Sequence, residues 1–576
     1  MNRILLFYRP LKDFVFIFNK KEKLSLAAWV LLNFLLTILD LLALAVTGVL
    51  VSAFIPIIQS KPANIPKVVK QLYSRIEPFF SLYEFLFTLA FIVAILLTMR
   101  SLLSLILERY FLGRLTEVNQ RLLKFILTSH FKLPIDKRIK KNKIDFLQAV
   151  HSSLNSLTHY VIGNFIIVLS EIFGLIMILL VVFVWKPIIT SILMFVIVSS
   201  LILAFKFHIK KSQKILRNYS KIDNHLAKEF LKLNEFANEF LVRSQLNLQI
   251  QKYLFQRNAL SEVISTRINQ FGYPRLILES GVLVSGFLVS LLVWYFLNIT
   301  EGLVVLSSYL ILGFRVLPAI LKVQNGIQVF LQHNESSRLA LEVIRYYQNV
   351  EMNQPNNLNI KYFKTPTLNI SNLSYSFEAG NLVLNKINFD IKTSGVYLIC
   401  GSNGTGKTTL LEILMGLRVP QSGNIKLNQQ DIVGMNPEAI GNHIAFLTQK
   451  PVFSTQSIAD SLLIGKLVED VITDESFTEA LKMLNQFNFD FNKYDLFQEY
   501  DLEQVLSEGE KQKIALVRTL IRKSTILIMD EPTVSLDLKS KEVLLNLVNE
   551  VSKFKIILIV THESIFDGNA QGRLAL

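Results

Sequence analysis

Cysteine is nearly absent from this sequence, which has one cysteine, Cys400, in 576 residues. A single thiol excludes an intramolecular disulfide. Because Cys400 ends an apolar run, the sequence predicts a small buried side chain there rather than a reactive one. The first residues also lack a short apolar region followed by small residues, so we expect that the N-terminus is retained and not removed as a signal peptide.

Acidic residues are outnumbered, with 45 Asp and Glu against 60 Lys and Arg, and the formal net charge is +15. Such a surplus is found in nucleic-acid-binding proteins and in membrane proteins with basic cytoplasmic loops. Here the basic residues gather near the N-terminus and in two polar stretches between apolar runs. This distribution favours a membrane protein and argues against a nucleic-acid partner.

Long apolar runs fill the first 325 residues, and hydrophobic residues make up 51% of the whole chain. A helix needs about 20 predominantly apolar residues to cross a bilayer. The last 210 or so residues instead have the mixed pattern of an ordinary α/β domain. The sequence therefore predicts six membrane spans at 24–58, 83–111, 161–185, 188–205, 276–296 and 303–321.

Two long polar stretches, 112–160 and 206–273, separate predicted spans. Both are rich in Lys and Arg, so the positive-inside rule places them, and with them both termini, in the cytoplasm. Apolar residues at helical spacing within these stretches predict that the membrane helices continue past the bilayer. Residues 64–80, on the outer side, fit either an amphipathic helix at the membrane surface or an ordered external loop.

Ionisable residues inside membrane spans are costly and usually face a cavity or a partner. Arg275 and Glu279 stand four residues apart and fit a pair on one helix face. Arg315 has apolar neighbours on both sides in the sequence, so an anionic ligand is a candidate partner for its guanidinium group. The full set is Asp40, Arg100, Glu108, Glu171, Arg275, Glu279 and Arg315.

A phosphate-binding loop follows a predicted strand at 396–400. Residues 401–408 read G-S-N-G-T-G-K-T, which fits the P-loop pattern G-x-x-x-x-G-K-[ST]. The glycines let backbone N–H groups wrap the phosphates, Lys407 neutralises phosphate oxygens and Thr408 offers its hydroxyl to Mg²⁺. We therefore expect ATP and Mg²⁺ as cofactors, with loop contacts from Gly401, Ser402, Asn403, Gly404, Thr405, Gly406, Lys407, Thr408 and Thr409.

A second apolar run, 526–530, ends in two adjacent carboxylates, Asp530 and Glu531. One of them would hold Mg²⁺, and the next would orient or deprotonate the attacking water. The segment L-S-E-G-E-K-Q lies at 506–512 between the two strands, and a third apolar run at 556–560 leads to His562. This order and spacing indicate an ATPase domain.

These motifs resemble those of the ABC-transporter nucleotide-binding domain over residues 366–576, and the six spans resemble type I (type IV fold) ABC exporters. The resemblance implies a multi-domain fold. An all-α six-helix transmembrane domain (1–325) and a linker (326–365) would precede an α/β P-loop ABC ATPase domain (366–576). It further implies an ATP hydrolase coupled to transmembrane transport, which works as a dimer with two ATP molecules sandwiched between two such domains.

Individual residues take their roles from the same resemblance. Phe377 matches the aromatic residue that stacks on adenine, and Gln449 matches the Q-loop glutamine that contacts Mg²⁺ and couples to the membrane domain. Ser507 and Gly509 match the signature motif, which grips the γ-phosphate bound by the partner subunit. The implied catalytic residues are Glu531 and the switch histidine His562, and the implied metal ligands are Thr408, Gln449 and Asp530.

The signature motif departs from its usual form, L-S-G-G-Q. This chain has Glu508 and Glu510 in place of Gly and Gln, which adds negative charge near a polyanion and predicts slowed or tuned hydrolysis. The acidic-glycine coupling segment common just upstream is reduced to Q-E-Y-D at 498–501. Because the P-loop lysine and both carboxylates are present, we expect two competent sites in a homodimer, and a heterodimer with another half-transporter is the alternative.

Short matches in the predicted spans resemble the bacterial flippase for lipid-linked oligosaccharides used in protein N-glycosylation. This resemblance implies transport of a polyprenyl-pyrophosphate glycan across the bacterial cytoplasmic membrane, with a lipid tail that stays in the bilayer. A pyrophosphate in a low-dielectric cavity needs cationic, preferably bidentate, donors. The matches, whose arginines are the candidate substrate contacts, are Arg100 with S-L-L after it, S-E-I-F at 170–173, Pro274 and Arg275 with Glu279, and Arg315 with Pro318.

Two alternatives stay open from the sequence. An exporter of a peptide or of another lipid would use the same scaffold, and no peptidase domain decides between them. An ATP-gated channel or sensor belongs to a different class, and Glu531 together with His562 argues against it because a gate can dispense with rapid turnover. A soluble ABC ATPase of DNA repair is excluded by the predicted spans.

Overall fold

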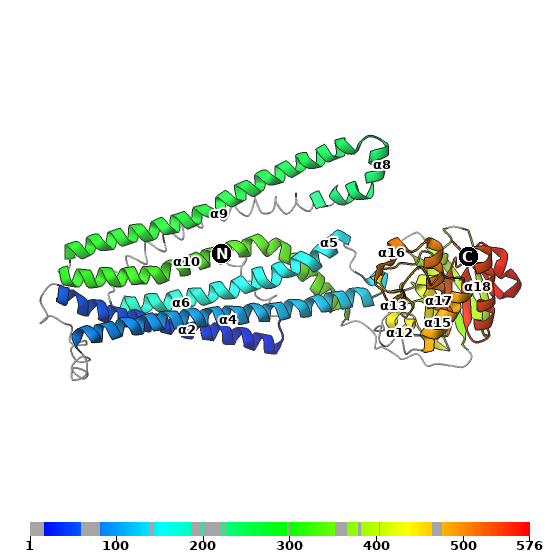
Figure 1. Ribbon diagram of the computed structural model, residues 1–576, viewed down its shortest axis with the longest axis horizontal. Helices are drawn as coiled ribbons and strands as arrows, with labels where there is room; N and C mark the ends of the chain where they lie inside the picture. The colour runs from blue at the N-terminus through cyan, green and yellow to red at the C-terminus, as the bar shows by residue number, and fades with distance from the viewer. Residues whose placement is uncertain are drawn as a thin grey trace. The chain divides into compact units, whose positions relative to one another are not determined.

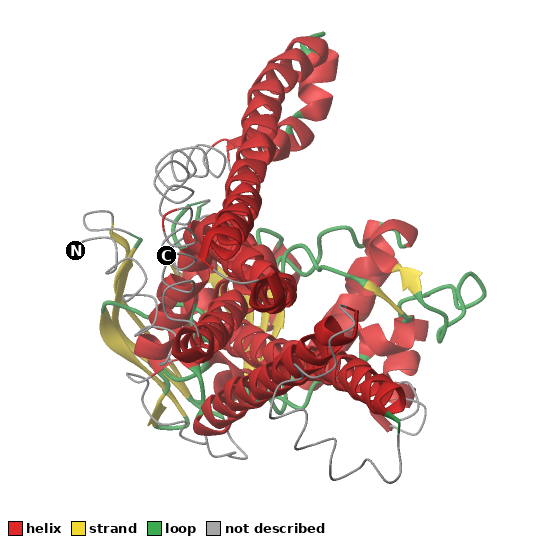
Figure 2. Cartoon of the chain, turned by 90° about the vertical axis from the view of Figure 1, so that its left-hand side faces the viewer, coloured by secondary structure: helices red, strands yellow, loops and turns green. Residues whose placement is uncertain are grey.

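The computed structural model divides the chain into two compact units. The first comprises Met1–Ile126 and Lys141–Tyr346, and the second comprises Leu127–Lys140 and Tyr347–Leu576. The described part of the first unit is helical, and the described strands all lie in the second (Figures 1 and 2). The structure describes residues 17–58, 81–138, 143–185, 199, 222, 225–227, 229–296, 299–351, 366–377, 382–402, 404–463 and 475–576.

Five long helices dominate the described part of the first unit. At a rise of about 1.5 Å per residue, the 51 residues of α4 extend over about 75 Å, more than twice the roughly 30 Å of a hydrocarbon core. This length agrees with the prediction that membrane helices continue past the bilayer. The long helices are α2 (Lys20–Ile58), α4 (Leu82–Lys132), α6 (Asn164–Trp185), α9 (Leu246–Phe296) and α10 (Ile299–Glu351).

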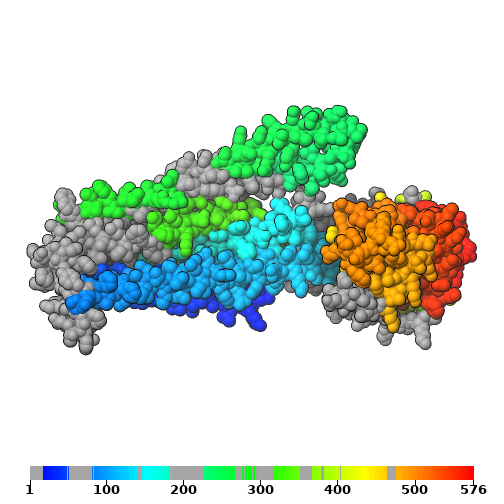
Figure 3. All heavy atoms as spheres, in the orientation of Figure 1, coloured from blue at the N-terminus to red at the C-terminus, as the bar shows by residue number. Residues whose placement is uncertain are grey.

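Shorter elements connect these helices. A helix α5 (Lys143–Gln148) leads through two π-helical stretches, η3 (Ala149–Ser153) and η4 (Ser156–Gly163), into α6. The small helix α8 (Ala237–Val242) lies at the tip of a hairpin whose long arm is α9, coloured green in Figures 1 and 3. A 3-10 turn, η2 (Ile135–Lys137), follows α4 and belongs to the second unit.

Close contacts join the long helices. The indole of Trp29 in α2 donates to the carbonyl of Leu107 in α4 at 3.0 Å and stacks on the ring of Phe111 with centroids 4.2 Å apart. In α10, a Cβ on Gly326 would lie 2.3 Å from the side chain of Val168 in α6. Glycine is therefore required where these two helices approach each other.

Three helical segments in the described part of the chain are long and apolar enough to cross a membrane: Lys20–Thr47, Glu84–Lys132 and Ser156–Val181. They overlap the first three predicted spans. The fifth and sixth predicted spans are helical within α9 and α10, whereas the fourth span, except for its residue 199, and the segment 64–80 lie outside the described residues. Residues 326–351 of the expected linker are a continuation of α10.

The second unit contains a parallel sheet flanked by an antiparallel one. The parallel sheet has the strand order β11-β3-β10-β9-β6, and the antiparallel sheet has the order β2-β1-β4-β5. The strands of the parallel sheet are β3 (Gly395–Cys400), β6 (Ile444–Leu447), β9 (Ile526–Asp530), β10 (Ile556–Val560) and β11 (Ala570–Ala575). Those of the antiparallel sheet are β1 (Leu368–Ser376), β2 (Leu382–Ile391), β4 (Ser422–Leu427) and β5 (Gln430–Asp431), and β7 (Thr455–Gln456) pairs separately with β8 (Tyr500–Asp501).

Near-continuous apolar runs form the central strands because both faces of the parallel sheet are covered. Leu527 and Met529 of β9 belong to one core cluster, and Ile526 and Ile528 belong to the other. Cys400 is half-buried against the first cluster. Besides η2, the described helices that lie wholly in this unit are α11 (Lys407–Leu414), α12 (Pro437–Gly441), α13 (Ile458–Leu462), α15 (Glu475–Gln486), α16 (Leu502–Val505), α17 (Glu508–Leu520), α18 (Leu538–Val551) and the 3-10 helix η5 (Ser564–Asn569).

Candidate functional site

Four of the predicted site segments follow the carboxyl ends of adjacent parallel strands. The P-loop follows β3, Gln449 follows β6, Glu531 follows β9 and His562 follows β10. Because parallel strands all end at the same edge of a sheet, segments that are far apart in the sequence are brought to one place. This edge is where ligands bind in open α/β sheets.

The P-loop is shaped by two glycines with positive φ. Gly404 has φ +88° and Gly406 has φ +96°, values that side-chain-bearing residues rarely adopt. A Cβ on Gly406 would also lie 2.9 Å from the side chains of Val383 and Leu384 in β2. The loop then opens α11, whose first turn begins at Lys407. A helix N-terminus at this point directs backbone N–H groups toward a phosphate. Asn403 lies outside the described residues.

Lys407 lies at the centre of the site. Its Nζ donates to the carbonyl of Gly401 at 2.6 Å and lies 3.3 Å from Nε2 of His562. The same imidazole nitrogen is 3.8 Å from a carboxylate oxygen of Glu531, and the other oxygen of Glu531 accepts from Nε2 of Gln449 at 2.8 Å. A continuous set of contacts therefore joins the P-loop lysine, the switch histidine, the second carboxylate and the Q-loop glutamine.

The two adjacent carboxylates differ in their surroundings. Burial raises the pKa of Asp530, and the negative charge of Glu531 raises it further while Lys407 opposes the shift. Glu531 has a positive φ of +48°, and its backbone N–H donates to the carbonyl of Val560 at 2.8 Å. The backbone is thus held by the neighbouring strand in a conformation that is strained for a glutamate.

These oxygen donors fit Mg²⁺. Hard divalent cations prefer carboxylate, amide and hydroxyl oxygens, which Asp530, Gln449 and Thr408 supply. Asp530 is half-buried, and a nearby cation would offset the cost of burying its charged carboxylate. Because Mg²⁺ keeps several waters and commonly binds substrate phosphates, these three residues would share the ion with phosphate oxygens and water.

Phe377 lies at the end of β1, with 52% of its surface exposed. Its ring meets that of the buried Tyr375 edge to face, with centroids 5.4 Å apart and an interplanar angle of 87°. The guanidinium carbon of Arg418 lies 4.9 Å from the centroid of Phe377. An exposed aromatic ring backed by a cation offers a flat surface for a purine.

The signature residues lie at the N-terminus of α17. Ser507 is the N-cap of this helix and forms a capping box with Glu510. A Cβ on Gly509 would lie 3.1 Å from the carbonyl oxygen of Ser535. The second departure, Glu508, pairs with the buried ammonium group of Lys511 at 3.0 Å. Both acidic departures are thus engaged by neighbours in the same chain.

The candidate substrate arginines lie in the first unit. Arg100 of α4 pairs with the buried Asp40 of α2 at 3.0 Å, and Arg275 pairs with Glu279 at 2.7 Å, as the four-residue spacing predicts. Arg315 lies in α10, but its side chain is outside the described residues. Two of the three predicted substrate contacts therefore already have a carboxylate partner.

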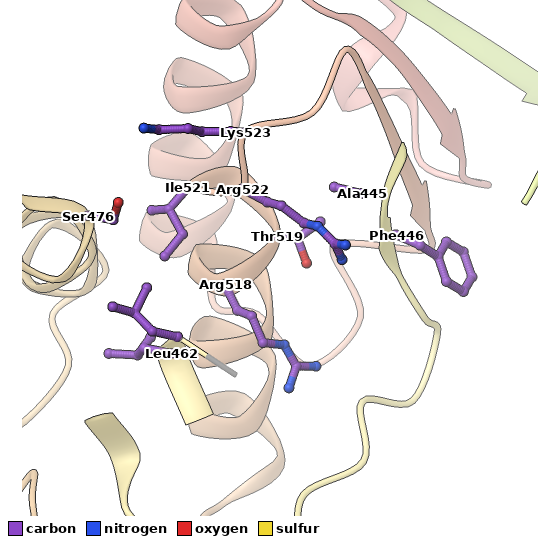
Figure 4. A pocket seen from close by; sticks show the side chains of 10 residues that line it. Ala445, Phe446, Leu462, Ser476, Arg518, Thr519, Ile521, Arg522 and Lys523 are labelled. Carbon is purple, nitrogen blue, oxygen red and sulfur yellow. The ribbon is translucent and has the colours of Figure 1, made fainter. Parts of the chain in front are cut away.

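A separate pocket of about 680 Å³ lies between β6, α13 and the end of α17 (Figure 4). Its lining includes three cationic side chains, Arg518, Arg522 and Lys523, together with Leu462 and Phe446. Burial lowers the pKa of Arg518, whose guanidinium group lies 5.6 Å from the ring centroid of Phe453. None of the P-loop residues lines this pocket, so it is distinct from the candidate nucleotide site.

Sequence motifs did not identify every residue around the site. Arg418 contacts both Tyr375 and Phe377, and Asp136 contacts Arg418 from 282 residues away. Lys493 and Tyr494 both contact the carboxylate of Glu510. In the sequence, Asp136 is marked only as the single acidic residue of the basic run I-D-K-R-I-K-K at 135–141.

Comparison with known proteins identifies the ATPase domain and the fold. A family model described as ABC transporter matches residues 384–534. An export ATP-binding/permease protein of Rickettsia bellii is 27% identical over 77% of this chain and 76% of its own. The glutathione/L-cysteine transport system ATP-binding/permease protein CydD of Haemophilus influenzae is 32% identical over 34% of this chain and 33% of its own. The solved structure of a bacterial Atm1-family ABC exporter with ATP bound matches with a TM-score of 0.71 and 15% identity, over 96% of this chain and 94% of that one.

The second unit therefore contains an ABC transporter ATPase domain, and the chain as a whole has an ABC exporter fold. Helices apolar enough to span a membrane accompany that domain. Together these findings support ATP hydrolysis coupled to transport. They leave the transported substrate unidentified.

Proposed function

We propose that this chain is one half of a homodimeric ATP-driven exporter of the bacterial cytoplasmic membrane, with both termini in the cytoplasm and Glu531 as the catalytic base. The observation that carries the proposal is the set of contacts from Lys407 through His562 and Glu531 to Gln449. These residues come from four separate strand ends, and an ATPase needs a cation, a base and a polar orienting group within reach of one phosphate.

The chemical step is assigned to this chain's own residues. Lys407 neutralises the β- and γ-phosphate oxygens, while the backbone N–H groups of the P-loop and of the first turn of α11 hold the phosphates. Glu531 accepts a proton from the attacking water, and Gln449 orients its carboxylate through the 2.8 Å hydrogen bond. His562 then contacts the γ-phosphate. Mg²⁺, held by Thr408, Gln449 and Asp530, would neutralise charge on the phosphate oxygens.

A dimer follows from the place of the signature residues. Ser507 and Gly509 begin α17, and the contacts described for them are with Glu510 and Ser535 rather than with the P-loop. A helix N-terminus that carries a serine cap is a suitable phosphate contact. In the proposed dimer, these two residues would contact the γ-phosphate that is bound by the partner's P-loop.

The helical unit supports transport across a bilayer. Large apolar side chains on α4, α6 and α9 are highly exposed, including Phe87 at 76%, Val184 at 83% and Leu283 at 74%. Apolar surface on this scale is unfavourable in water but favourable against lipid tails. These helices therefore fit a membrane domain whose outer surface contacts lipid.

For the cargo we retain the lipid-linked oligosaccharide, a polyprenyl-pyrophosphate glycan, as the candidate. It rests on the resemblance at Arg100, Arg275 and Arg315 and on the suitability of arginine for pyrophosphate. The ion pairs of Arg100 and Arg275 weigh against a direct role for those two, which leaves Arg315 as the main candidate. A peptide is the second candidate, since a lactococcin transport/processing protein of Lactococcus lactis is 33% identical over 34% of this chain.

The test of the ATPase assignment is turnover of the protein reconstituted in lipid nanodiscs. Glu531→Gln should retain ATP binding and lose turnover by about 10²-fold or more, the range of a general-base contribution. Glu563→Gln is the matched control, because this carboxylate follows β10 and pairs with Lys541, so turnover should be unchanged. Normal turnover in Glu531→Gln would remove Glu531 from the base role.

The test of the cargo uses the same nanodiscs with added substrate. Polyprenyl-pyrophosphate glycan should raise ATP turnover, and Arg315→Gln should remove the stimulation while basal turnover is kept. A rise with hydrophobic peptide and none with the lipid-linked glycan would replace the first candidate with the second. Stimulation that survives in Arg315→Gln would exclude that arginine as the head-group contact.

A further inference from the structure

The segment that follows α4 is bound to the ATPase domain by several hydrogen bonds within the second unit. The backbone N–H of Ile135 donates to the carbonyl of Leu417 at 2.6 Å. Asp136 accepts at one carboxylate oxygen from the backbone N–H of Val419 at 3.1 Å. Its other oxygen accepts from Nη1 of Arg418 at 3.0 Å and from the hydroxyl of Tyr375 at 2.9 Å. One carboxylate thus accepts hydrogen bonds from three residues near Phe377.

Arg418 is fixed by these contacts. Besides Asp136, its guanidinium group pairs with Glu412 and donates to the hydroxyl of Tyr375 at 3.1 Å. Its side chain is 15% exposed. Burial works against the charge, but the hydrogen bonds that Arg418 donates to Glu412 and Tyr375 outweigh burial and raise the pKa of Arg418. The cation is therefore permanent and has little freedom to move.

We propose that Arg418 is a positioning residue for the adenine of ATP and that Asp136 sets its position. The proposal rests on the proposed function, in which Phe377 stacks on adenine. The guanidinium carbon lies 4.9 Å from the ring centroid of Phe377, within the range of a cation–π contact. Tyr375 meets the same ring edge-on. With a cation and a second ring fixing it from the protein side, Phe377 presents its exposed surface to the base.

Pre-organisation explains how this arrangement acts on affinity. A free phenylalanine side chain loses rotamer freedom when it stacks on a ligand, and that loss weakens binding. Contacts with Arg418 and Tyr375 restrict the ring beforehand, so less freedom is lost on binding. Because Asp136 fixes the cation, docking of the segment 134–137 and binding of adenine must favour each other by the same factor. The segment after α4 therefore influences nucleotide affinity without touching the nucleotide.

The test measures ATP affinity by calorimetry in nanodiscs, with Glu531→Gln present in every variant to prevent turnover. Asp136→Asn keeps the size of the side chain and removes its charge, and Arg418→Gln removes the cation. Each should weaken ATP binding about 3- to 10-fold, the range of a cation–π contact. Arg418→Lys should recover part of the loss. Affinity for inorganic tripolyphosphate, which has no base to stack, should stay within about twofold.

A matched control separates this role from docking in general. Lys132, the last residue of α4, and Glu438 form another ion pair with the same domain, at 2.5 Å, and neither touches Arg418. Glu438→Gln should leave ATP affinity unchanged. An equal loss in Glu438→Gln, or unchanged ATP affinity in both Asp136→Asn and Arg418→Gln, would overturn the inference. Equal losses for ATP and tripolyphosphate would also overturn it.

Two further measurements keep the test decisive. With Glu531 intact, Asp136→Asn should raise the KM for ATP and leave kcat unchanged, whereas a folding defect would lower the amount of active protein and thus the apparent kcat. Phe377→Ala tests the proposed function separately. If it leaves ATP affinity unchanged, the adenine assignment itself is wrong; if it weakens ATP binding while Asp136→Asn and Arg418→Gln do not, only the role of Arg418 is wrong.

Discussion

The hydroxyl oxygen of Ser507 lies 2.7 Å from a carboxylate oxygen of Glu510, three residues further along the chain. The same carboxylate oxygen of Glu510 accepts from the backbone N–H of Ser507 at 2.8 Å. Lys493 and Tyr494 each approach the carboxylate at 3.2 Å. The carboxylate of Glu510 thus already accepts from the donors of Ser507 that the γ-phosphate would use in the proposed dimer.

This relationship predicts that Glu510 restrains ATP-driven closure of the dimer. Glu510→Gln removes the negative charge and keeps the size of the side chain, so it should lower the ATP concentration for half-maximal turnover about 3- to 10-fold. That range corresponds to roughly 1 kcal/mol of relieved repulsion near a protein surface. Steady-state ATPase assays in nanodiscs measure it.

Glu508→Gln is the control for Glu510. Glu508 also replaces a residue of the usual signature, but its carboxylate pairs with Lys511 and not with Ser507. Glu508→Gln should therefore change the KM for ATP much less than Glu510→Gln. A KM that rises in Glu510→Gln would mean that the capping box helps Ser507 to meet the phosphate, contrary to the restraint.

The raised pKa of Asp530 predicts a conflict between stability and activity. The pKa of Asp530 in the folded protein lies above its value in the unfolded chain. The protonated carboxyl group therefore contributes its full stability below the unfolded pKa, and this stability is lost as the pH rises through the folded pKa. At pH 7 to 8 the charged carboxylate therefore destabilises the protein. Asp530→Asn should raise stability by on the order of 0.5–2 kcal/mol, seen as a higher Tm, while Mg²⁺-dependent turnover is lost.

Magnesium provides the check on that explanation. Adding Mg²⁺ and ATP should raise the Tm of the wild-type protein far more than that of Asp530→Asn, because the variant lacks the charged ligand. Equal stabilisation of both proteins would show that Asp530 does not hold the metal. The Tm gap between the two proteins without nucleotide should narrow as the pH is lowered toward the folded pKa of Asp530.

The two P-loop glycines should respond differently to alanine. At Gly406 a methyl group meets the side chains of Val383 and Leu384 at 2.9 Å, in addition to the positive φ, whereas at Gly404 it meets nothing within 4 Å. Gly406→Ala should therefore destabilise the protein by about 1–3 kcal/mol more than Gly404→Ala. Thermal unfolding of the two variants in the same detergent compares them. Equal Tm values would mean that β2 shifts to accommodate the added methyl group without loss of stability.

The ion pair of Arg100 and Asp40 predicts a structural role for both residues. Breaking a buried pair leaves one charge without compensation, which costs about 3–5 kcal/mol, whereas replacing both partners by apolar residues is often neutral. Arg100→Leu and Asp40→Leu should each lower the Tm and the yield in membranes, and the double variant should recover both. If Arg100→Leu keeps its stability but loses stimulation by the lipid-linked glycan, Arg100 belongs to the substrate site instead.

The predicted site residues lie together in the structure because their motifs are short and local. Each follows a buried strand, and parallel pairing alone brings the strand ends together, so Lys407, Gln449, Glu531 and His562 could be grouped before their distances were known. Apolar runs such as 526–529 and 556–560 set the strand register, and this register aligns the strand ends.

Long-range pairs could not be predicted in the same way. Asp136 and Arg418 are 282 residues apart, and their contact depends on where a polar segment docks on a folded domain. The start of the expected linker was also misjudged, since residues 326–351 continue α10. A helix outside the bilayer tolerates a polar face, so a polar stretch that follows the last predicted span can remain helical.

The positive φ of Glu531 has an evolutionary consequence. Left-handed backbone favours glycine and asparagine, so glutamate at this place is less stable than the alternatives that a few nucleotide changes would supply. In the proposed function, the need for a catalytic base at this position accounts for a glutamate there. In lineages where one half of such a transporter no longer needs to hydrolyse ATP, this position should be among the first to drift, and the drifted proteins should unfold at higher temperatures than their active ancestors.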